Sequence, residues 1–242
     1  MAELGRYRSK KEKQFYLKRK EILNDLDSQF IADNPFLFSH RIIVSDMLAR
    51  IMLFKEILNI SGSIVECGVA NGNSLMLYAY MSEILEPFAI NRKIIGFDSF
   101  EGFRSISSEN DPKNISKQDF SDAQETVIKN AIELYDMNRP LGHMERIEII
   151  KGDAVTTIPE YVKHHPELTC SLLYLDFDIY KPTKVALEHL LPLVAKGGIV
   201  AFDEFNYDKF SGETLAAKEV LNINERKLKR FEFSPFIAYF EV

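Results

Sequence analysis

Cysteine is scarce in this chain of 242 residues, which contains only Cys67 and Cys170 and no tryptophan. Two isolated cysteines that form no C-x-x-C pair exclude a zinc finger and a disulfide scaffold. The chain has no run of about 18 consecutive apolar residues, and its N-terminus lacks the pattern of a signal peptide. We therefore expect a cytoplasmic protein with reduced thiols and no membrane partner.

Basic residues are also scarce outside the N-terminus. The formal net charge is −6, yet residues 1–20 carry eight Lys or Arg and only two acids. The other 222 residues hold 22 basic and 34 acidic side chains, a net charge of −12. Nucleic-acid-binding proteins present a basic face, so we expect no nucleic-acid partner. The basic arm is interpreted as a solvated or loosely docked segment.

The composition is that of a globular protein, with 46% hydrophobic and 27% charged residues. Up to about residue 60 the apolar residues recur at helical spacing, with a break at Asn34-Pro35 and a second helix from Ser45 to Leu58. We therefore predict a helical extension or lid over residues 1–60 and a main domain over residues 61–242.

From residue 63 onward, short apolar runs alternate with helical stretches. This alternation predicts an α/β fold, a doubly wound and mostly parallel sheet with helices on both faces. In the tail Lys227–Val242, apolar and polar residues alternate around Ser234-Pro235, which predicts a β-hairpin or paired edge strands. The predicted strands are Ser63–Cys67, Lys93–Phe97, Ile147–Ile150, Leu172–Leu175 and Ile199–Phe202, and the predicted helices cover 73–86, 121–136, 155–163, 183–195 and 213–222.

Two local features accompany this pattern. The polar stretch Arg104–Phe120 is long for a connection, which favours a lid or binding loop, although a simple surface insertion stays open. Ser121 and Gln124 have the spacing of a capping box for the helix that follows.

A glycine-rich turn follows the first strand, with Glu66 before it and Gly68 and Gly72 within it. It departs from the dinucleotide pattern G-x-G-x-x-G at Ala70 and Asn73, and no P-loop sequence occurs. Asp98 ends the next strand, and Asp153 follows the third. Ligands of open α/β sheets bind outside the carboxyl ends of the strands. We therefore predict a ligand site at this edge, although each acid alone is also compatible with a helix cap or turn.

An acid followed by G-x-x-x-G resembles the first motif of class I S-adenosylmethionine (SAM) methyltransferases. The runs from Glu66 to Ser74, from Gly96 to Gly102 (GFDSFEG) and from Leu175 to Tyr180 (LDFDIY), with Gly197-Gly198-Ile199 and Asp203-Glu204, resemble the macrocin/mycinamicin/novobiocin O-methyltransferase family. The chain departs from the family pattern at Ala70-Asn71, at Ala154 and at Glu204. The resemblance implies a Rossmann-like sheet of seven strands. It also implies that SAM is bound by Glu66, Gly68, Gly72, Ser74, Asp98, Ser99, Asp153, Ala154 and Asp176.

Four more acids lie at the ends of the fourth and fifth strands: Asp176, Asp178, Asp203 and Glu204. Carboxylates at one rim repel one another unless a hard cation such as Mg²⁺ binds them. The family resemblance implies Asp176, Asp203 and Glu204 as the metal ligands. Asp176 is also the candidate catalytic base, while Asp178 either supports the ligands or fixes the turn. The alternative is that these acids are turn residues or helix caps.

The chain is therefore predicted to be a SAM- and Mg²⁺-dependent O-methyltransferase that acts on a small molecule. The predicted acceptor is a hydroxyl group of a sugar, and the sugar is free, nucleotide-linked or part of a glycoside. A catechol or phenol acceptor and a non-catalytic SAM-binding module are the alternatives. The N-terminal helices are candidates for pairing subunits, and we expect a homo-oligomer, a dimer.

Overall fold

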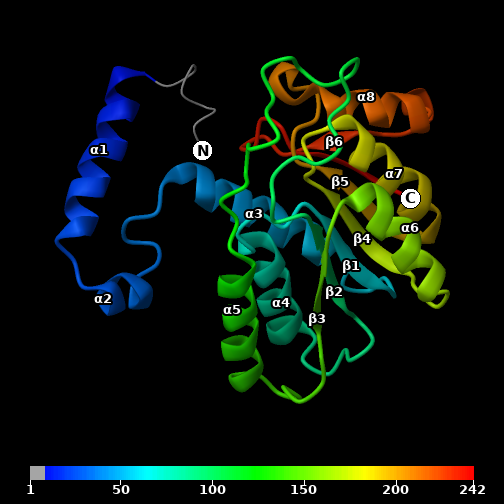
Figure 1. Cartoon of the computed structure of the whole chain (residues 1–242). Coiled ribbons are helices and arrows are strands. Elements are labelled where there is room, and N and C mark those ends of the chain that lie inside the picture. Colours follow the sequence, from blue (N-terminus) through cyan, green and yellow to red (C-terminus); the bar gives the residue numbers. More distant parts are fainter. Residues whose placement is uncertain (1–8) are drawn as a thin grey trace. The chain divides into compact units, whose positions relative to one another are not determined.

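The computed structural model describes residues 9–242, and the chain divides into two compact units, up to Ser45 and from Asp46 to Val242 (Figure 1). The boundary lies within helix α3 (Arg41–Glu56), fifteen residues before the boundary that the sequence suggests. In the described part of the chain, no helix is both long and apolar enough to cross a membrane.

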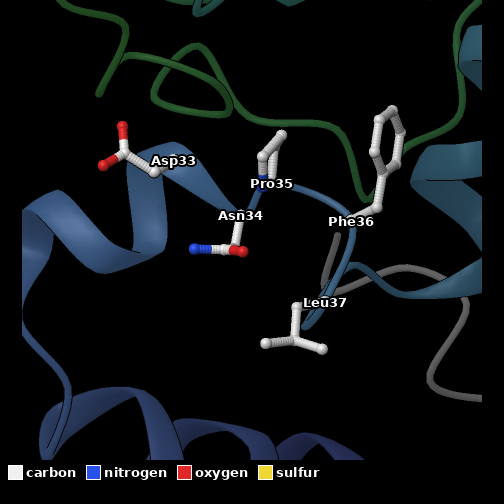
Figure 2. A pocket seen from close by; sticks show the side chains of 5 residues that line it. All are labelled: Asp33, Asn34, Pro35, Phe36 and Leu37. Atoms are coloured by element: carbon white, nitrogen blue, oxygen red, sulfur yellow. The ribbon is translucent and has the colours of Figure 1, made fainter.

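The N-terminal unit contains α1 (Lys10–Asn24) and α2 (Ser28–Asp33). Ser9 and Glu12 form a capping box at the start of α1, and neither helix buries a side chain. This unit has a hollow of about 440 Å³. It is lined by five consecutive residues from Asp33 to Leu37, whose side chains are drawn in Figure 2. None of these five residues is among the predicted site residues, so this hollow is not the predicted site.

The main unit is built on a seven-stranded sheet in the order β3-β2-β1-β4-β5-β7-β6. The first five strands are parallel, whereas β7 is antiparallel to β5 and to β6. The predicted doubly wound sheet and the C-terminal hairpin are thus confirmed. The strands are β1 (Ser63–Cys67), β2 (Ile94–Asp98), β3 (Ile147–Lys151), β4 (Cys170–Leu175), β5 (Val194–Phe202), β6 (Lys229–Arg230) and β7 (Ala238–Glu241).

Helices cover both faces of this sheet (Figure 1). Successive side chains of a strand point to opposite faces, so Leu172 and Tyr174 of β4 join one core while Leu173 and Leu175 join the other. The first core receives α3, α4 (Asn73–Leu85) and α5 (Glu125–Met137), and the second receives α6 (Ala154–His164), α7 (Tyr180–Leu190) and α8 (Ser211–Val220).

Two local predictions about helix ends are wrong. The capping box does not form, because Ser121 lies in a turn, where its N–H donates to the Gln118 carbonyl, and α5 begins only at Glu125. Helix α7 begins three residues before the predicted start and ends five before the predicted end. Its last turn tightens into a 3₁₀ turn, Leu191–Leu193, that contains a proline.

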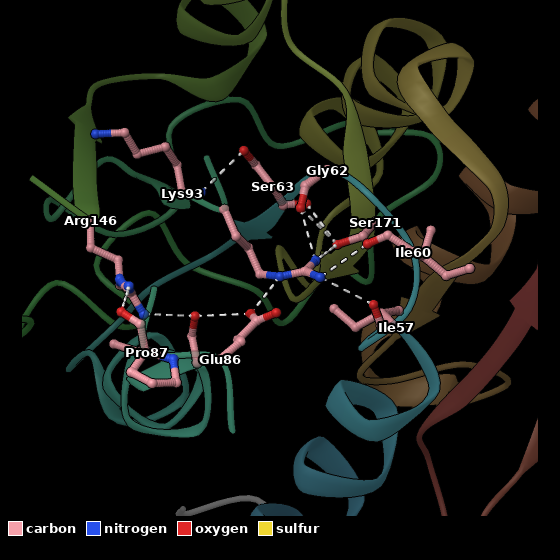
Figure 3. Close-up of polar contacts among 12 residues, drawn as sticks. Ile57, Ile60, Gly62, Ser63, Glu86, Pro87, Lys93, Arg146 and Ser171 are labelled. Atoms are coloured by element: carbon pink, nitrogen blue, oxygen red, sulfur yellow. Dashed lines mark hydrogen bonds and ion pairs between the residues drawn. The ribbon is translucent and has the colours of Figure 1, made fainter. Parts of the chain in front are cut away.

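Two buried arginines form hydrogen bonds at the amino-terminal edge of the sheet (Figure 3). Arg92 donates to the Gly62 carbonyl at 2.9 Å and to the Ser171 hydroxyl at 2.6 Å, and it pairs with Glu86. Arg146 donates to the Pro87 carbonyl at 3.0 Å. These contacts hold the strand starts together and leave the opposite, carboxyl-terminal edge to the predicted site.

Candidate functional site

The glycine turn between β1 and α4 lies against the end of β4. Gly68 has a φ of +102°, and a Cβ atom there would meet the Asp176 carbonyl oxygen at 2.0 Å. Gly72 caps α4 in the left-handed conformation, with a φ of +77°. Glycine adopts both conformations without steric cost. The absence of a side chain at Gly68 therefore allows the predicted cofactor turn and the predicted acidic rim to touch.

Glu66 and Ser74 lie beneath this turn. Glu66 is fully buried, and Ser74 Oγ donates to its Oε1 atom. Burial raises the pKa of Glu66 to about 7, and the Ser74 hydrogen bond opposes the rise. The second oxygen, Oε2, is buried without a hydrogen-bond partner. Glu66 therefore has an unpartnered oxygen beneath the glycine turn, and its role in cofactor binding stays a prediction.

Asp98 closes the glycine turn with its carboxylate. Its Oδ2 atom accepts the backbone N–H groups of Val69 and Ala70, both at 2.8 Å, and Oδ1 accepts that of Phe100 at 2.7 Å. The next residue, Ser99, donates to the Gly102 carbonyl at 2.7 Å. A carboxylate oxygen has two lone pairs, so Oδ1 retains one for a ligand hydroxyl.

Asp153 and Ala154 begin α6 at the end of β3. Asp153 Oδ1 accepts the Val155 N–H at 3.1 Å and caps the helix, while Ala154 is buried. Asp153 Oδ2 accepts the hydroxyl of Ser105, a residue of the long Arg104–Phe120 stretch. The sequence did not identify Ser105 as a site residue, and its contact brings this stretch to Asp153, one of the residues predicted to bind SAM.

Asp111 ties the same stretch to the start of α7. Its buried carboxylate accepts the N–H of Tyr180 at 2.8 Å and that of Ser107 at 2.6 Å. Phe103 and Phe120 are in ring contact, and Phe120 also contacts Phe210, next to α8. We call residues 104–120 the strap, because they run from Asp153 to α7 along the carboxyl edge of the sheet.

Three carboxylates converge where β4 and β5 end. Asp176, Asp178 and Glu204 each offer an oxygen, and these oxygens lie within 4.8 Å of one another. Asp178 has a φ of +63° and is buried. Burial, together with repulsion from neighbouring carboxylates, raises the pKa of Asp176 and of Asp178 well above the usual value. An all-oxygen, negatively charged donor set of this kind suits Mg²⁺, so these residues fit a divalent cation.

Asp203, which the sequence places among the metal ligands, lies outside this group of three. Its Oδ1 atom accepts a hydrogen bond from the Tyr174 hydroxyl and another from Arg50 Nη2 at 3.0 Å. Arg50 Nη2 also lies 3.5 Å from Asp176 Oδ2. Sequence reasoning missed Arg50, which comes from α3. In the structure, Asp203 is thus ion-paired with Arg50, whereas Asp178 lies next to Asp176 and Glu204.

Glu213 of α8 is a further buried acid that sequence reasoning missed. Its side chain has no solvent exposure, and its Oε2 atom accepts the Glu204 N–H at 3.1 Å. Its Oε1 atom has no hydrogen-bond partner. Burial raises the pKa of Glu213 well above the usual value, as does repulsion from Glu204 and Asp203. Glu213 therefore holds the backbone of Glu204 in place, and its raised pKa favours the neutral acid beneath the converging carboxylates.

Comparison with known proteins gives a family and several relatives. Residues 8–226 match the family described as macrocin-O-methyltransferase (TylF). A curated relative from Streptomyces olivaceus, 8-demethyl-8-(2,3-dimethoxy-alpha-L-rhamnosyl)-tetracenomycin-C 4'-O-methyltransferase, is 27% identical over 158 residues. The match covers 62% of this chain and 55% of the relative, so the chain spans about half the length of that relative.

Solved structures agree with the family match. The calicheamicin methyltransferase CalS11 has a TM-score of 0.90 at 29% identity, with 97% of this chain and 93% of that chain covered. Its apo structure, described as a TDP-rhamnose 3'-O-methyltransferase, has a TM-score of 0.83 at 28% identity, with coverages of 97% and 95%. The O-methyltransferase NovP, at 17% identity and a TM-score of 0.63 over 81% of this chain and 78% of that chain, supports the fold alone.

Proposed function

Because the chain belongs to the macrocin O-methyltransferase family, we propose that it transfers the methyl group of SAM to a hydroxyl group of a sugar. The observation that carries this proposal is the contact between the glycine turn and the acidic rim at Gly68 and Asp176. That contact supports the proposal, because the turn predicted to bind the cofactor and the carboxylates proposed to activate a hydroxyl lie next to each other. The acceptor we propose is a nucleotide-linked deoxysugar, since the similar CalS11 is described as acting on TDP-rhamnose.

The cofactor site we propose follows the sequence prediction. Glu66 offers its unpartnered Oε2 to a donor of the methionine portion, and Ser74 orients Glu66 through its hydroxyl. Asp98 offers one lone pair of Oδ1 to the ribose. Gly68, Gly72, Ser99, Asp153, Ala154 and Asp176 complete the proposed SAM site.

For the acceptor side, we propose that Asp176, Asp203 and Glu204, the ligands predicted from the sequence, hold a divalent cation, with Asp178 close to Asp176 and Glu204. When bound, a Mg²⁺ ion would supply Lewis-acid assistance to the loss of the hydroxyl proton. A sugar hydroxyl must lose its proton as it attacks, and the proposed acceptor of that proton is the carboxylate of Asp176. The glycine turn and the rim then align the nucleophilic oxygen with the methyl carbon and the sulfur of SAM. The dimer predicted from the sequence stays a prediction.

The test incubates the purified enzyme with SAM and either TDP-rhamnose or a catechol and follows the methylated product by mass spectrometry. We expect methylation of the sugar nucleotide, its loss after chelation with EDTA, and its recovery with Mg²⁺. Asp176→Asn should lose at least about 100-fold in rate, the magnitude typical of a general base, while SAM still raises its melting temperature. The control is Asp122→Asn, an exposed acid outside the site, which should behave as wild type.

Three results would contradict parts of this proposal. Methylation of the catechol but not of the sugar nucleotide would replace the sugar by a phenolic acceptor. Undiminished turnover in EDTA would remove the metal. Loss of the SAM-induced melting shift in Asp176→Asn would mean that Asp176 serves mainly the cofactor rather than the reaction.

A further inference from the structure

Asp111 joins the middle of the strap to the start of α7. The side chain is 6% exposed, and its Oδ1 atom accepts the N–H of Tyr180, the first residue of α7, at 2.8 Å. Its Oδ2 atom accepts the N–H of Ser107, within the strap, at 2.6 Å. The first N–H groups of a helix have no partner inside the helix, and Ile179 before α7 has no polar side chain that could accept one. Asp111 therefore caps α7 from a position 69 residues earlier in the chain.

Helix α8 packs against the same hydrogen bond. A Cβ atom on Gly212, in the first turn of α8, would lie 2.3 Å from Asp111 Oδ1 and 2.4 Å from the Tyr180 nitrogen. Glycine is a poor helix former, so this close approach accounts for its presence here. Ser211, at the start of α8, also donates its hydroxyl to the Asn110 carbonyl of the strap at 3.4 Å. The strap, α7 and α8 thus meet at Asp111, where α8 has no room for a side chain.

Apolar side chains hold this part of the strap as well. A small core, separate from the two cores of the sheet, contains Ile106 and Ile115 of the strap together with Phe103, Ile179, Tyr207, Phe210 and Phe236. Ile179 follows β4, whereas Tyr207 and Phe210 follow β5. These contacts place the strap against the two segments that leave the ends of β4 and β5, on the side where the acceptor is proposed to bind.

The start of the strap has a different anchor. Ser105 donates its hydroxyl to Asp153 Oδ2, and Asp153 caps α6 at the end of β3. Asp153 is also one of the residues predicted to bind SAM. The strap therefore has one anchor on the proposed cofactor side and another on the proposed acceptor side.

We propose that Asp111 is a positioning residue for the sugar acceptor, because it holds the strap in place as one wall of the acceptor site. This inference rests on the proposed function, which supplies the acceptor. Asp111 is too buried to contact a ligand itself, so it acts through the strap. A loosened strap would occupy the binding-competent conformation for only part of the time, and the apparent affinity for the acceptor would fall by that fraction.

The test combines steady-state kinetics with TDP-rhamnose at saturating SAM and calorimetric titration of SAM binding. Asp111→Asn keeps the shape of the side chain but replaces one acceptor oxygen by an NH₂ group, which turns a donor toward one of the two N–H groups. We expect the KM for TDP-rhamnose to rise at least about tenfold and kcat to change less than about threefold, the pattern of lost binding rather than lost transition-state stabilisation. The dissociation constant of SAM should stay within about twofold of wild type, because the cofactor side keeps its own anchor.

Gly212→Ala keeps the test decisive if Asp111→Asn does not fold. This substitution changes no polar group and adds a methyl group 2.3 Å from Asp111 Oδ1, so the carboxylate must move. The KM for TDP-rhamnose should again rise at least about tenfold, although alanine is the better helix former.

Two further variants separate the anchors. The matched control is Asp119→Asn, because Asp119 also accepts an N–H of the strap, that of Ser116 at 2.9 Å, but this bond stays within the strap. Its KM for TDP-rhamnose and its SAM affinity should match those of wild type. Ser105→Ala removes the anchor on the cofactor side. It should weaken SAM binding at least about threefold, through the lost hydrogen bond to Asp153, and leave the KM for TDP-rhamnose unchanged.

Unchanged KM values for TDP-rhamnose in Asp111→Asn and Gly212→Ala, with an active wild type, would overturn the role of Asp111 and leave the proposed function intact. Equal losses of SAM and acceptor affinity in these variants would overturn it as well, because a general loosening of the protein produces that pattern. If wild type methylates no sugar nucleotide, the proposed function fails and the acceptor role of Asp111 fails with it. The wild-type assay therefore distinguishes the two failures.

Discussion

Replacing Gly68 by alanine tests whether the glycine turn must touch the acidic rim. The new Cβ atom would lie 2.0 Å from the Asp176 carbonyl oxygen and 2.7 Å from its carbonyl carbon, both of them backbone atoms that cannot rotate away. A φ of +102° is itself strained for alanine, at a cost of about 1–3 kcal/mol. Forcing the two loops apart adds about 1–3 kcal/mol. We therefore expect Gly68→Ala to destabilise the protein by about 4 kcal/mol.

Thermal denaturation measures this effect. In a protein of this size, 1 kcal/mol shifts the melting temperature by about 2–4 °C, so Gly68→Ala should melt roughly 10 °C lower than wild type. The control is Gly72→Ala, where the positive φ costs about 1–2 kcal/mol and the new Cβ atom meets the side chain of Ile128, at 3.1 Å, rather than backbone atoms. If Gly68→Ala melts no lower than Gly72→Ala, the close approach of the turn and the rim is not present in solution.

Two further substitutions test the buried acids around the site. Folding raises the pKa of Glu66 from 4.5 to about 7, mainly through burial, so the folded state binds the proton more tightly and stability falls as pH rises through this interval. Glu66→Gln should abolish this pH-dependent loss of stability, which is about 3 kcal/mol. In EDTA, its melting temperature should therefore depend less steeply on pH than that of wild type, and an unchanged slope would contradict the prediction. Asp111→Ala leaves the buried N–H groups of Ser107 and Tyr180 without acceptors and should cost about 2–6 kcal/mol in urea denaturation. Asp119→Ala, which removes one acceptor elsewhere in the strap, should cost about 1 kcal/mol, and equal effects would refute the anchoring role of Asp111.

The sheet could be predicted because each central strand is recognisable from its own local sequence. Each central strand is a short apolar run between polar turns, and Leu172–Leu175 fills both faces of the sheet without any polar residue except the Tyr174 hydroxyl. Helix ends were harder to place, because they depend on single turns. Ser121 and Gln124 have the right spacing for a capping box, but the turn before them delays the helix to Glu125.

The candidate site could be predicted only where its residues follow strands. Asp98, Asp153, Asp176 and Asp203 each end or follow a strand, so the topology alone brings them to one edge. Arg50 precedes its partner Asp203 by 153 positions, and no local pattern links the two. An acid in the first turn of α8 was the available signal for Glu213, but periodicity does not say which face of a helix is buried against a polar site.

The hydrogen bonds of Asp98 change what the sequence alone implies for the cofactor site. An acid at the end of the second strand suggests a carboxylate open to both ribose hydroxyls, yet Oδ2 already accepts two backbone N–H groups and Oδ1 a third. One lone pair remains, so a second ribose hydroxyl needs another acceptor or must displace a backbone N–H of the turn. Displacement would leave the N–H of Val69, which is buried, without a partner, at a cost of about 1–3 kcal/mol. The main role of Asp98 is therefore to fix the conformation of the glycine turn. Only its remaining lone pair is available to bind a hydroxyl of the ribose.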